Sequence, residues 1–445
     1  MLNEKLDLYL EEEYYPFHMP GSKRSELLRS DLPYRRDLTE IYGFDNLNDP
    51  EDIFVEMEEK LARIYGVKKA IISTNGSTSG ILSTIRALCR NNKNILIQRS
   101  SHKSVYNACE LNSLNVSYIN IVTDEQLAIK DIYHVDLEEK LKKGNYLALV
   151  LTSPSYEGYL LDLQRIYKLC RENNTKLILD MAHGSHLSLT NLYDNSFDVA
   201  ITSFHKNLSA LTPSAAVLIN DMEYFDEIKR NMAIFQTSSP SYVILQSIDE
   251  MIEKFESFGP LYKKLEKKLN DLYRLKLDYL KIIDSTEKDR SKILISTKNA
   301  NISGSDLDKL LREDKIEIEM SYPDYVLLIS TIFDTKEGFD RLKKSLLRID
   351  GLLGTKTKSY SLDLPIPQKK LEICEAINCK KKYVKLEDSL GKISGEFVYA
   401  YPPGSPIIAP GEIIDSEILS TFTYMLDNNI HLNIINEYIS VIIDK

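Results

Sequence analysis

Between residues 46 and 255, short apolar runs alternate with stretches whose apolar residues recur at helical spacing. The runs predict strands at 68–74, 94–100, 116–122, 146–154, 176–184, 198–204 and 215–220. Helices are predicted between many of them, including 78–90 and 162–173. Several runs are continuously apolar, as in strands covered by helices on both faces of a sheet. The alternation predicts an α/β fold with a mostly parallel, doubly wound sheet.

The rest of the chain is predicted to form further domains, since 445 residues are too many for one ordinary core. We expect an N-terminal arm over 1–45 with a short helix, followed by a major domain over 46–257. A long lysine-rich helix is predicted at 258–284, opening a smaller α+β domain over 258–355 with helices near 304–313 and 335–349. Residues 356–445 form a predicted C-terminal subdomain.

The composition narrows the class of protein. A net charge of −10 argues against a general nucleic-acid binder, which needs a basic face. No apolar run is long enough for a membrane span, and the first 15 residues lack the apolar core of a signal peptide. The cysteines are scattered without CxxC spacing, which predicts the reducing cytoplasm as the setting. They are Cys89, Cys109, Cys170, Cys374 and Cys379.

Polar residues follow the predicted strands at their carboxyl ends, where open α/β sheets bind ligands. The segment 75–80, NGSTSG, opens a helix and can cradle a phosphate, although it also suits a plain N-cap. Asp180 closes a buried strand and requires a cation nearby. His205 and Lys206 follow the strand at 198–204, and His102 and His183 follow two others.

These four features match the four parts of pyridoxal 5′-phosphate. The cradle suits the phosphate, an imidazole suits the flat ring, the carboxylate suits the ring nitrogen, and an amine suits the aldehyde. We therefore interpret Lys206 as a Schiff-base lysine with His205 as its helper. NGSTSG lacks the GxGxxG and GK[ST] patterns of other phosphate loops, and the histidines lack an HExxH frame, so no metal site is predicted.

Eight blocks of the sequence resemble the Orn/Lys/Arg decarboxylase family in its short form. These are fold-type-I pyridoxal-phosphate enzymes with an aminotransferase-like major domain. The blocks follow the family's order: PFHMPGSKR, NGSTSGILSTI, RSSHKSVYNA, LTSPSYEGYLLDL, LILDMAHGSHL, SFHKNLSALTPSA, FQTSSPSYVILQSID and YPPGSPIIAPGE.

The resemblance implies a role for each matching residue. Lys206 would carry the cofactor, Asp180 would pair with the ring nitrogen, and His102 would stack on the ring. His183 would lie near the phenolic oxygen. The phosphate would be bound by the loop at Gly76 together with Ser77, Thr78, Ser203 and His205. Thr237 would reach the phosphate of a neighbouring subunit, so we expect a homodimer or higher homo-oligomer with shared active sites.

Carbanion chemistry at Cα follows from the site, whereas decarboxylation rests on the resemblance. Arginine giving agmatine is the favoured reaction, then lysine giving cadaverine, then ornithine, each a step of polyamine biosynthesis. Glu412 and Glu157 are candidates for binding a cationic substrate side chain. Pro402 and Pro403 in YPPGSP predict a rigid turn in the pocket wall.

Two alternatives stay open at this point. An aminotransferase or lyase could use the same fold. An aminotransferase would commonly bind the substrate carboxylate with an arginine of the small domain, but none is identified, because Arg290, Arg312 and Arg341 all lie in charged stretches expected to be solvated. A non-catalytic relative is the other alternative. The chain also departs from the family pattern at Ser22, where histidine is usual, at Phe204, where a small residue or threonine is usual, and at Asn207, where threonine is common.

Overall fold

The computed structural model of the chain describes residues 1–356, 366–400, 404–428 and 430–444. The chain divides into two compact units that alternate along the sequence. Unit 1 is Met1–Leu88 with Lys176–Leu261, and unit 2 is Cys89–Thr175 with Tyr262–Lys445. The domain boundaries expected at residues 45, 257 and 355 stay a prediction. The prolines of the expected YPPGSP turn, Pro402 and Pro403, lie outside the described residues.

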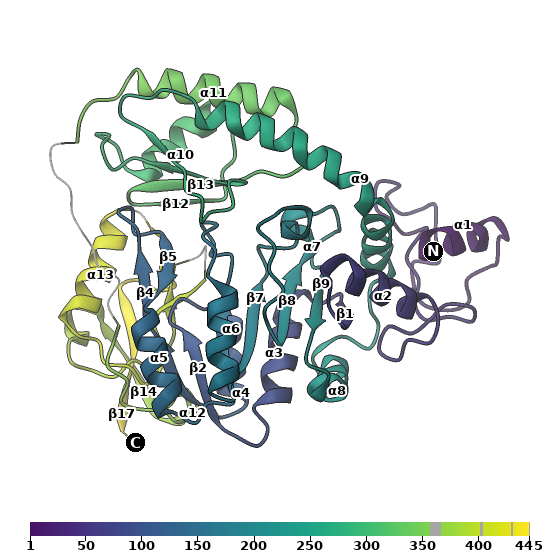
Figure 1. Cartoon of the computed structure of the whole chain (residues 1–445), viewed down its shortest axis with the longest axis horizontal. Coiled ribbons are helices and arrows are strands. Elements are labelled where there is room, and N and C mark those ends of the chain that lie inside the picture. The colour runs from purple at the N-terminus through teal and green to yellow at the C-terminus, as the bar shows by residue number, and fades with distance from the viewer. Residues whose placement is uncertain (357–365, 401–403, 429, 445) are drawn as a thin grey trace. The chain divides into compact units, whose positions relative to one another are not determined.

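Unit 1 is built on four neighbouring strands in the order β1, β9, β8 and β7 (Figure 1). Their bounds are β1 Lys69–Ser73, β7 Lys176–Met181, β8 Val199–Ser203 and β9 Ala215–Ile219. Strand β8 runs parallel to β7, while β9 runs antiparallel to both β8 and β1. Every residue of β8 and β9 is buried, in agreement with their continuous apolar runs. Ala215 faces both Ser73 and Ser203, so β1 and β8 end at the same level.

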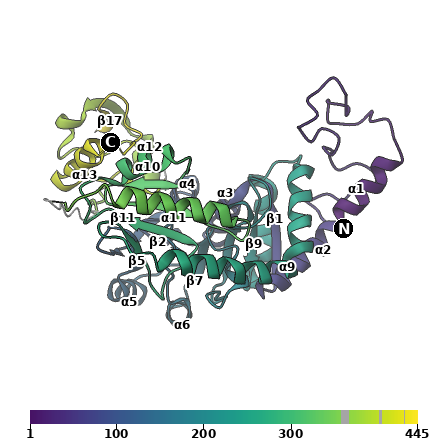
Figure 2. The same cartoon turned by 90° about the horizontal axis from the view of Figure 1, so that it is seen from above.

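Unit 1 contains the helices α1 Leu2–Glu11, α2 Ile53–Tyr65, α3 Gly76–Leu88, α7 Phe204–Asn207 and α8 Phe225–Phe235, with short 3-10 turns at Leu187–Leu189 and Met222–Tyr224. Helices α2, α3 and α7 contact the strands of unit 1, whereas α1 lies away from them (Figure 1). Helix α3 lies so close to β8 and β9 that a Cβ on Gly80 would be 3.0 Å from both Ile201 and Val217. After α1, residues 12–52 are described throughout and have neither helix nor strand; Figure 2 shows them standing out beyond α1 and α2.

The long helix differs from its prediction at both ends. Helix α9 spans Tyr242–Tyr273 and contains Pro260, whereas a helix over 258–284 was expected. Proline is common in the first turn of a helix, so Pro260 resembles a start signal. Leu245, Ile248 and Met251, before the proline, are fully buried at helical spacing, and Leu265 and Leu269 continue a buried face after it. The residues after Tyr273 instead lead into strand β10, Lys281–Ile283.

The first part of unit 2 holds three parallel strands in the order β6, β2 and β3. Their bounds are β2 Asn94–Gln98, β3 Asn115–Ile119 and β6 Ala148–Thr152, with helices α4 Lys103–Leu111, α5 His134–Lys143 and α6 Leu163–Glu172. The single strand expected over 116–122 is interrupted. Its second half is β4, Ile121–Thr123, which turns away to pair antiparallel with β5, Ile129–Ile132.

The second part of unit 2 begins with a four-stranded antiparallel sheet in the order β10, β11, β13 and β12. Helices α10 and α11 lie over this sheet in Figure 1, near the predicted positions. Helix α10 begins with a capping box between Ser303 and Asp306. The bounds are β11 Lys292–Ser296, α10 Gly304–Glu313, β12 Met320–Tyr322, β13 Tyr325–Ile329 and α11 Lys336–Asp350.

The last part of unit 2 has its own small core, which includes Val398, Ile408, Ile418 and Phe422. Its elements are α12 Ile373–Asn378, β14 Lys380–Lys385, a 3-10 turn Leu386–Ser389, β15 Val398–Tyr399, β16 Pro406–Ile408, α13 Ser416–Asp427 and β17 Tyr438–Asp444. The predicted α/β class is confirmed by the strands and helices of both units. Within the described ranges, no helix is both long and apolar enough to cross a membrane.

Candidate active site

Lys206 lies in the short helix α7, directly after the buried strand β8. Phe204 is fully buried and anchors this helix, so the side chain that departs from the family pattern has a packing role. His205 Nδ1 lies 3.0 Å from the carbonyl oxygen of Ser214, and burial lowers the pKa of this imidazole. Lys206 Nζ lies 2.9 Å from His183 Nε2. The structure therefore brings the predicted lysine and one predicted histidine into hydrogen-bond contact.

Asp180 lies one residue before the end of β7 and is 4% exposed. Burial raises the pKa of this carboxyl group, and the positive charge of Lys206 opposes that rise. The backbone N–H of Ala182 donates to it at 3.1 Å. Because β7 and β8 are parallel, Asp180, His183 and Lys206 meet at one edge of the sheet in unit 1.

The predicted phosphate loop follows β1 at the same level. Gly76 has φ +73°, a conformation that favours glycine, and its N–H donates to the carbonyl of Pro213 at 2.9 Å. Helix α3 starts there, so Ser77 and Thr78 lie in its first turn, where backbone N–H groups attract anions.

Three buried hydroxyl groups near this loop could bind a polar ligand. Thr74 Oγ1, Ser203 Oγ and Ser214 Oγ are buried and have no hydrogen-bond partner among the residues that the structure describes, whereas such groups are normally paired. Ser73 and Ser203 both face Ala215, which brings the ends of β1 and β8 together around these oxygens. The residues present therefore fit a phosphate-bearing cofactor with an aldehyde for Lys206.

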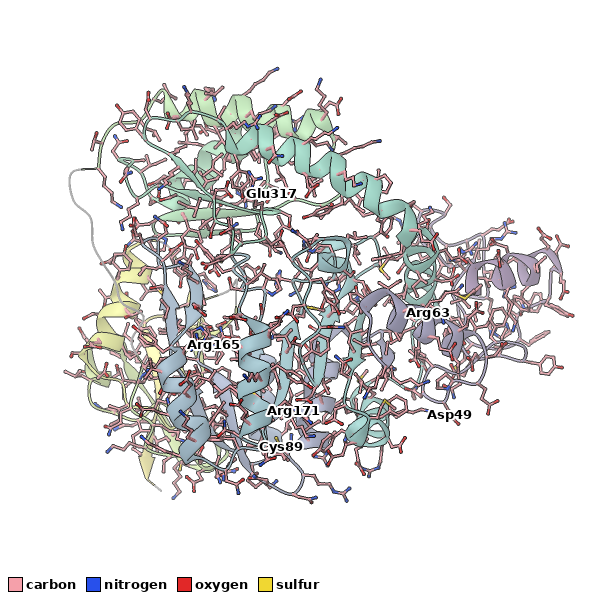
Figure 3. The ribbon with its side chains drawn as sticks, viewed as in Figure 1. Asp49, Arg63, Cys89, Arg165, Arg171 and Glu317 are labelled. Atoms are coloured by element: carbon pink, nitrogen blue, oxygen red, sulfur yellow. The ribbon has the colours of Figure 1, made fainter. Side chains whose placement is uncertain are left out.

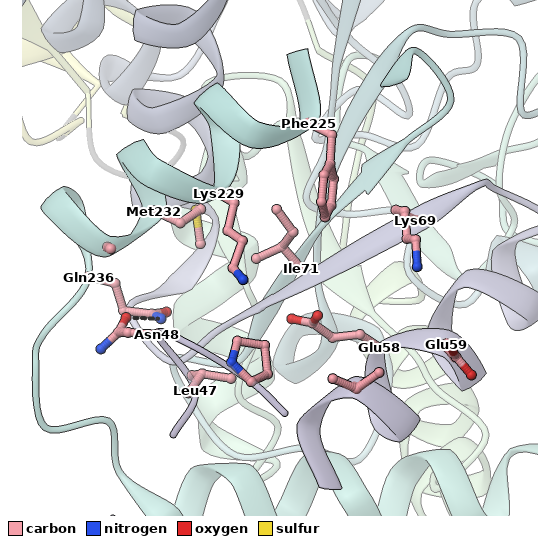
Figure 4. Close-up of a pocket in the computed structure, with 13 residues that line it drawn as sticks. Leu47, Asn48, Glu58, Glu59, Lys69, Ile71, Phe225, Lys229, Met232 and Gln236 are labelled. Atoms are coloured by element: carbon pink, nitrogen blue, oxygen red, sulfur yellow. Dashed lines mark hydrogen bonds between the residues drawn. The ribbon is translucent and has the colours of Figure 1, made fainter. Parts of the chain in front are cut away.

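Gln236, at the end of α8, supports the loop and was not singled out in the sequence. Its side-chain oxygen accepts the N–H of Thr74 at 3.0 Å, and its nitrogen donates to Asn48 at 3.4 Å (Figure 4). Thr237 follows, and its N–H lies 3.4 Å from the side-chain oxygen of Asn75 in its own chain. Thr74 and Gln236 are too far apart in the sequence for a local pattern to predict their contact.

Glu58 points into a pocket that Gln236 and Asn48 also line (Figure 4). Lys229 points into the same pocket from α8. Burial raises the pKa of Glu58 to about 8, although Lys229, Lys69 and the N–H of Ile72 oppose the rise. The carboxylate accepts that N–H at 3.0 Å and so holds β1 just before the loop.

His102 belongs to unit 2, where it caps the N-terminus of α4. Its Nδ1 accepts the N–H of Ser104 at 3.2 Å and lies 2.9 Å from the Ser104 hydroxyl. The N-cap fixes the ring on the loop that follows β2.

The two glutamates considered for the substrate are both buried in unit 2. Glu412 is 1% exposed, and both of its oxygens bond to Arg99 at 2.7 and 2.9 Å. Glu157 is 3% exposed and accepts hydrogen bonds from the Tyr325 hydroxyl at 3.0 Å and the Ser155 hydroxyl at 3.2 Å. Burial raises the pKa of Glu157. Glu157 lines a pocket within unit 2, whereas the carboxylate of Glu412 is paired with Arg99.

The arginines considered for an aminotransferase are engaged elsewhere in unit 2. Arg312 bonds to Asp308 and to Glu317, which is labelled in Figure 3. Arg290 pairs with Asp284 at 3.1 Å, and Arg341 donates to a backbone carbonyl. These contacts engage all three guanidinium groups within unit 2.

Known proteins resemble nearly the whole chain. Residues 2–269 match the family described as Orn/Lys/Arg decarboxylase, major domain, and residues 367–431 match its C-terminal domain. An arginine decarboxylase of Halalkalibacterium halodurans is 30% identical over 93% of this chain and 90% of its own, and one of Bacillus subtilis is 27% identical over 92% and 90%. The crystal structure of the lysine decarboxylase LdcF from Francisella novicida superposes on this chain with a TM-score of 0.85 at 19% identity. The match covers 99% of this chain and 81% of LdcF. The aminotransferase-like, fold-type-I class is thereby confirmed.

Proposed function

Because the chain belongs to the Orn/Lys/Arg decarboxylase family, we propose that it removes the α-carboxyl group of a basic amino acid with pyridoxal 5′-phosphate as its cofactor. Arginine is the first candidate, since the relatives similar over most of the chain carry the name arginine decarboxylase. Lysine and then ornithine follow. The observation that carries the proposal is the meeting of Lys206, His183 and Asp180 at the carboxyl edge of β7 and β8.

Each residue of this cluster has a defined task. Lys206 would hold the cofactor covalently through its amine. The Asp180 carboxylate would keep a proton on the ring nitrogen, and that positive charge would in turn satisfy the buried carboxylate. The bound cofactor supplies an electron sink for the pair released when the Cα–carboxyl bond breaks. His183 Nε2 lies 2.9 Å from Lys206 Nζ, close enough to exchange a proton with it.

The phosphate would be held by the start of α3 and the buried hydroxyls at the ends of β1 and β8. His205 is fixed to the carbonyl of Ser214, so it shapes this side of the site in its neutral form. His102 would cover the ring face, Thr237 would reach a partner's phosphate, and Glu157 is the remaining candidate for the substrate's cationic end. Cytoplasmic location and a homodimer with shared sites stay predictions.

The test is CO2 release by the purified full-length protein from arginine, lysine and ornithine in parallel, together with its absorbance spectrum. We expect a cofactor band near the visible edge and CO2 from one of the three. Lys206→Ala should abolish the band and lower CO2 release by about a thousandfold. Lys254→Ala, an exposed lysine on α9, is the matched control and should retain both.

Other outcomes would favour the alternatives. A band with ketoacid formation and no CO2 would identify an aminotransferase on the same fold. A protein that shows neither a band nor turnover after the cofactor is added would be a non-catalytic relative, and the proposal would be wrong.

A further inference from the structure

We propose that segment 404–412 is a brace that positions the loop carrying His102, and that Glu412 acts in this brace as a positioning residue through Arg99. The inference rests on the proposed function only for the task of His102. It assigns Glu412 a role other than binding the substrate. The brace and the loop both belong to unit 2.

The centre of the brace is a buried ion pair. Arg99 Nη1 donates to Glu412 Oε1 at 2.7 Å, and Arg99 Nη2 donates to Glu412 Oε2 at 2.9 Å. The two side chains are 6% and 1% exposed. A bidentate pair of this kind fixes orientation as well as distance, because the two hydrogen bonds are parallel. The backbone N–H of Ala409 also donates to Glu412, at 2.7 Å, so the carboxylate is held from its own segment.

Three further contacts join the same two segments. Arg99 Nη2 donates to the carbonyl of Ile407 at 2.9 Å. The hydroxyl of Ser405 donates to the carbonyl of Ser100 at 2.7 Å, and the N–H of Lys103 donates to the carbonyl of Gly404 at 3.3 Å. The brace therefore contacts Arg99, Ser100 and Lys103, which flank His102 on both sides.

The loop also has contacts outside the brace. The N–H of Ser101 donates to Gln98, and the Tyr106 hydroxyl donates to the carbonyl of Arg99 at 2.6 Å. His102 itself contacts Ser104 in the first turn of α4. These bonds fix the ring relative to α4. The N–H of Arg99 also donates to the carbonyl of Ile119 in β3 at 3.0 Å, and the brace adds further long-range hydrogen bonds to Arg99, Ser100 and Lys103.

Because the ion pair is buried, its main effect is to fix the arrangement of the two segments and not to stabilise the fold. A buried ion pair contributes little net stability compared with apolar residues of similar size, because both charges lose their water. It does impose one arrangement of its two segments. Glu412 is 1% exposed and its charge is already paired with Arg99, so its carboxylate offers little to a cationic substrate.

The experiment compares three full-length proteins with the wild type. Glu412→Gln breaks the pair with little change of shape, and the double variant Arg99→Met with Glu412→Leu removes both charges while keeping the site apolar. Asp324→Asn is the matched control, because Asp324 forms a 2.6 Å pair with Lys356 in the same unit and has no bond to residues 99–103.

The first readout is amide hydrogen exchange, measured on the protein without cofactor. We expect exchange at residues 100–105 to rise about tenfold in Glu412→Gln and in the double variant, with β11 and β13 unchanged. The control should leave residues 100–105 as in the wild type. Should Glu412→Gln fail to fold, the double variant decides, since it leaves no unpaired buried charge.

The second readout is the circular dichroism of added pyridoxal phosphate, which reports how the ring is held, together with kcat and KM. We expect a weaker band and a kcat lowered about tenfold, with KM changed less, in the brace variants only. Unchanged exchange at residues 100–105, or equal changes in Asp324→Asn, would overturn the proposal. If the wild type releases no CO2, the proposed function is wrong, and hydrogen exchange at residues 100–105 still tests the brace.

Discussion

Replacing Gly76 with alanine tests the phosphate loop through its backbone. Gly76 has φ +73°, and an added Cβ would meet only Pro213, at an ordinary 3.5 Å. The cost is therefore backbone strain without a clash, about 1–2 kcal/mol of folding free energy for alanine in this conformation. Relief of that strain would turn the first N–H groups of α3 away from the bound phosphate.

Loss of one hydrogen bond to a charged group corresponds to about 1.5–3 kcal/mol of binding free energy. We therefore expect Gly76→Ala to raise the dissociation constant of pyridoxal phosphate by about tenfold to a hundredfold, since about 1.4 kcal/mol is a factor of ten. The assay is titration of the protein, freed of cofactor, with pyridoxal phosphate, followed by absorbance.

Gly391→Ala is the matched control. Gly391 has φ +75° and nothing within 4 Å of an added Cβ, so it carries the same strain outside the loop. We expect both variants to lose similar stability in denaturant unfolding and only Gly76→Ala to lose cofactor affinity. Wild-type affinity in Gly76→Ala, or an equal loss in Gly391→Ala, would refute the assignment of the loop.

Two further predictions concern stability. Phe204→Ala should lower the free energy of unfolding by about 3–5 kcal/mol, because Phe204 is fully buried beneath α7; thermal unfolding measures this, and a loss below about 1 kcal/mol would contradict the packing role. Glu58 has a pKa of about 8 in the folded state, above its ordinary 4.5. Between these two pH values the folded state binds more protons than the unfolded state, so the contribution of Glu58 to stability falls as the pH rises through this range. Glu58→Gln removes that fall. Its free energy of unfolding relative to wild type should therefore increase from pH 4.5 to 8, by a few kcal/mol at most, and level off above, and denaturant unfolding measures this at each pH. A difference that does not depend on pH would show that the carboxyl group titrates normally.

Much of the fold could be predicted from the sequence because its signals are local. Continuous apolar runs identified β1, β8 and β9, since strands covered on both faces have no polar side to alternate. Chemically distinctive residues at the carboxyl ends of β7 and β8 identified Asp180, His183 and Lys206. The topology of a parallel sheet places such residues at one edge whatever the distance between them in the sequence.

The errors arose where a local signal competed with packing. Pro260 resembled the start of a helix, yet α9 begins at Tyr242, because Leu245, Ile248 and Met251 bury one apolar face before the proline. The run at 116–122 is one apolar stretch, but its second half pairs with β5 instead of extending β3. A local pattern gives the periodicity of an element, and tertiary contacts decide its ends.

The sequence by itself determined the α/β class, the order of the main elements and the residues of the cluster around Lys206. Only the tertiary structure decided the partners of the polar side chains. Glu412 and Arg99 are 313 positions apart, and Gln236 and Thr74 are 162 apart. Burial makes each of these pairings necessary, because an unpaired buried polar group is costly. Which distant group satisfies it depends on how the whole chain packs, and no local pattern records that.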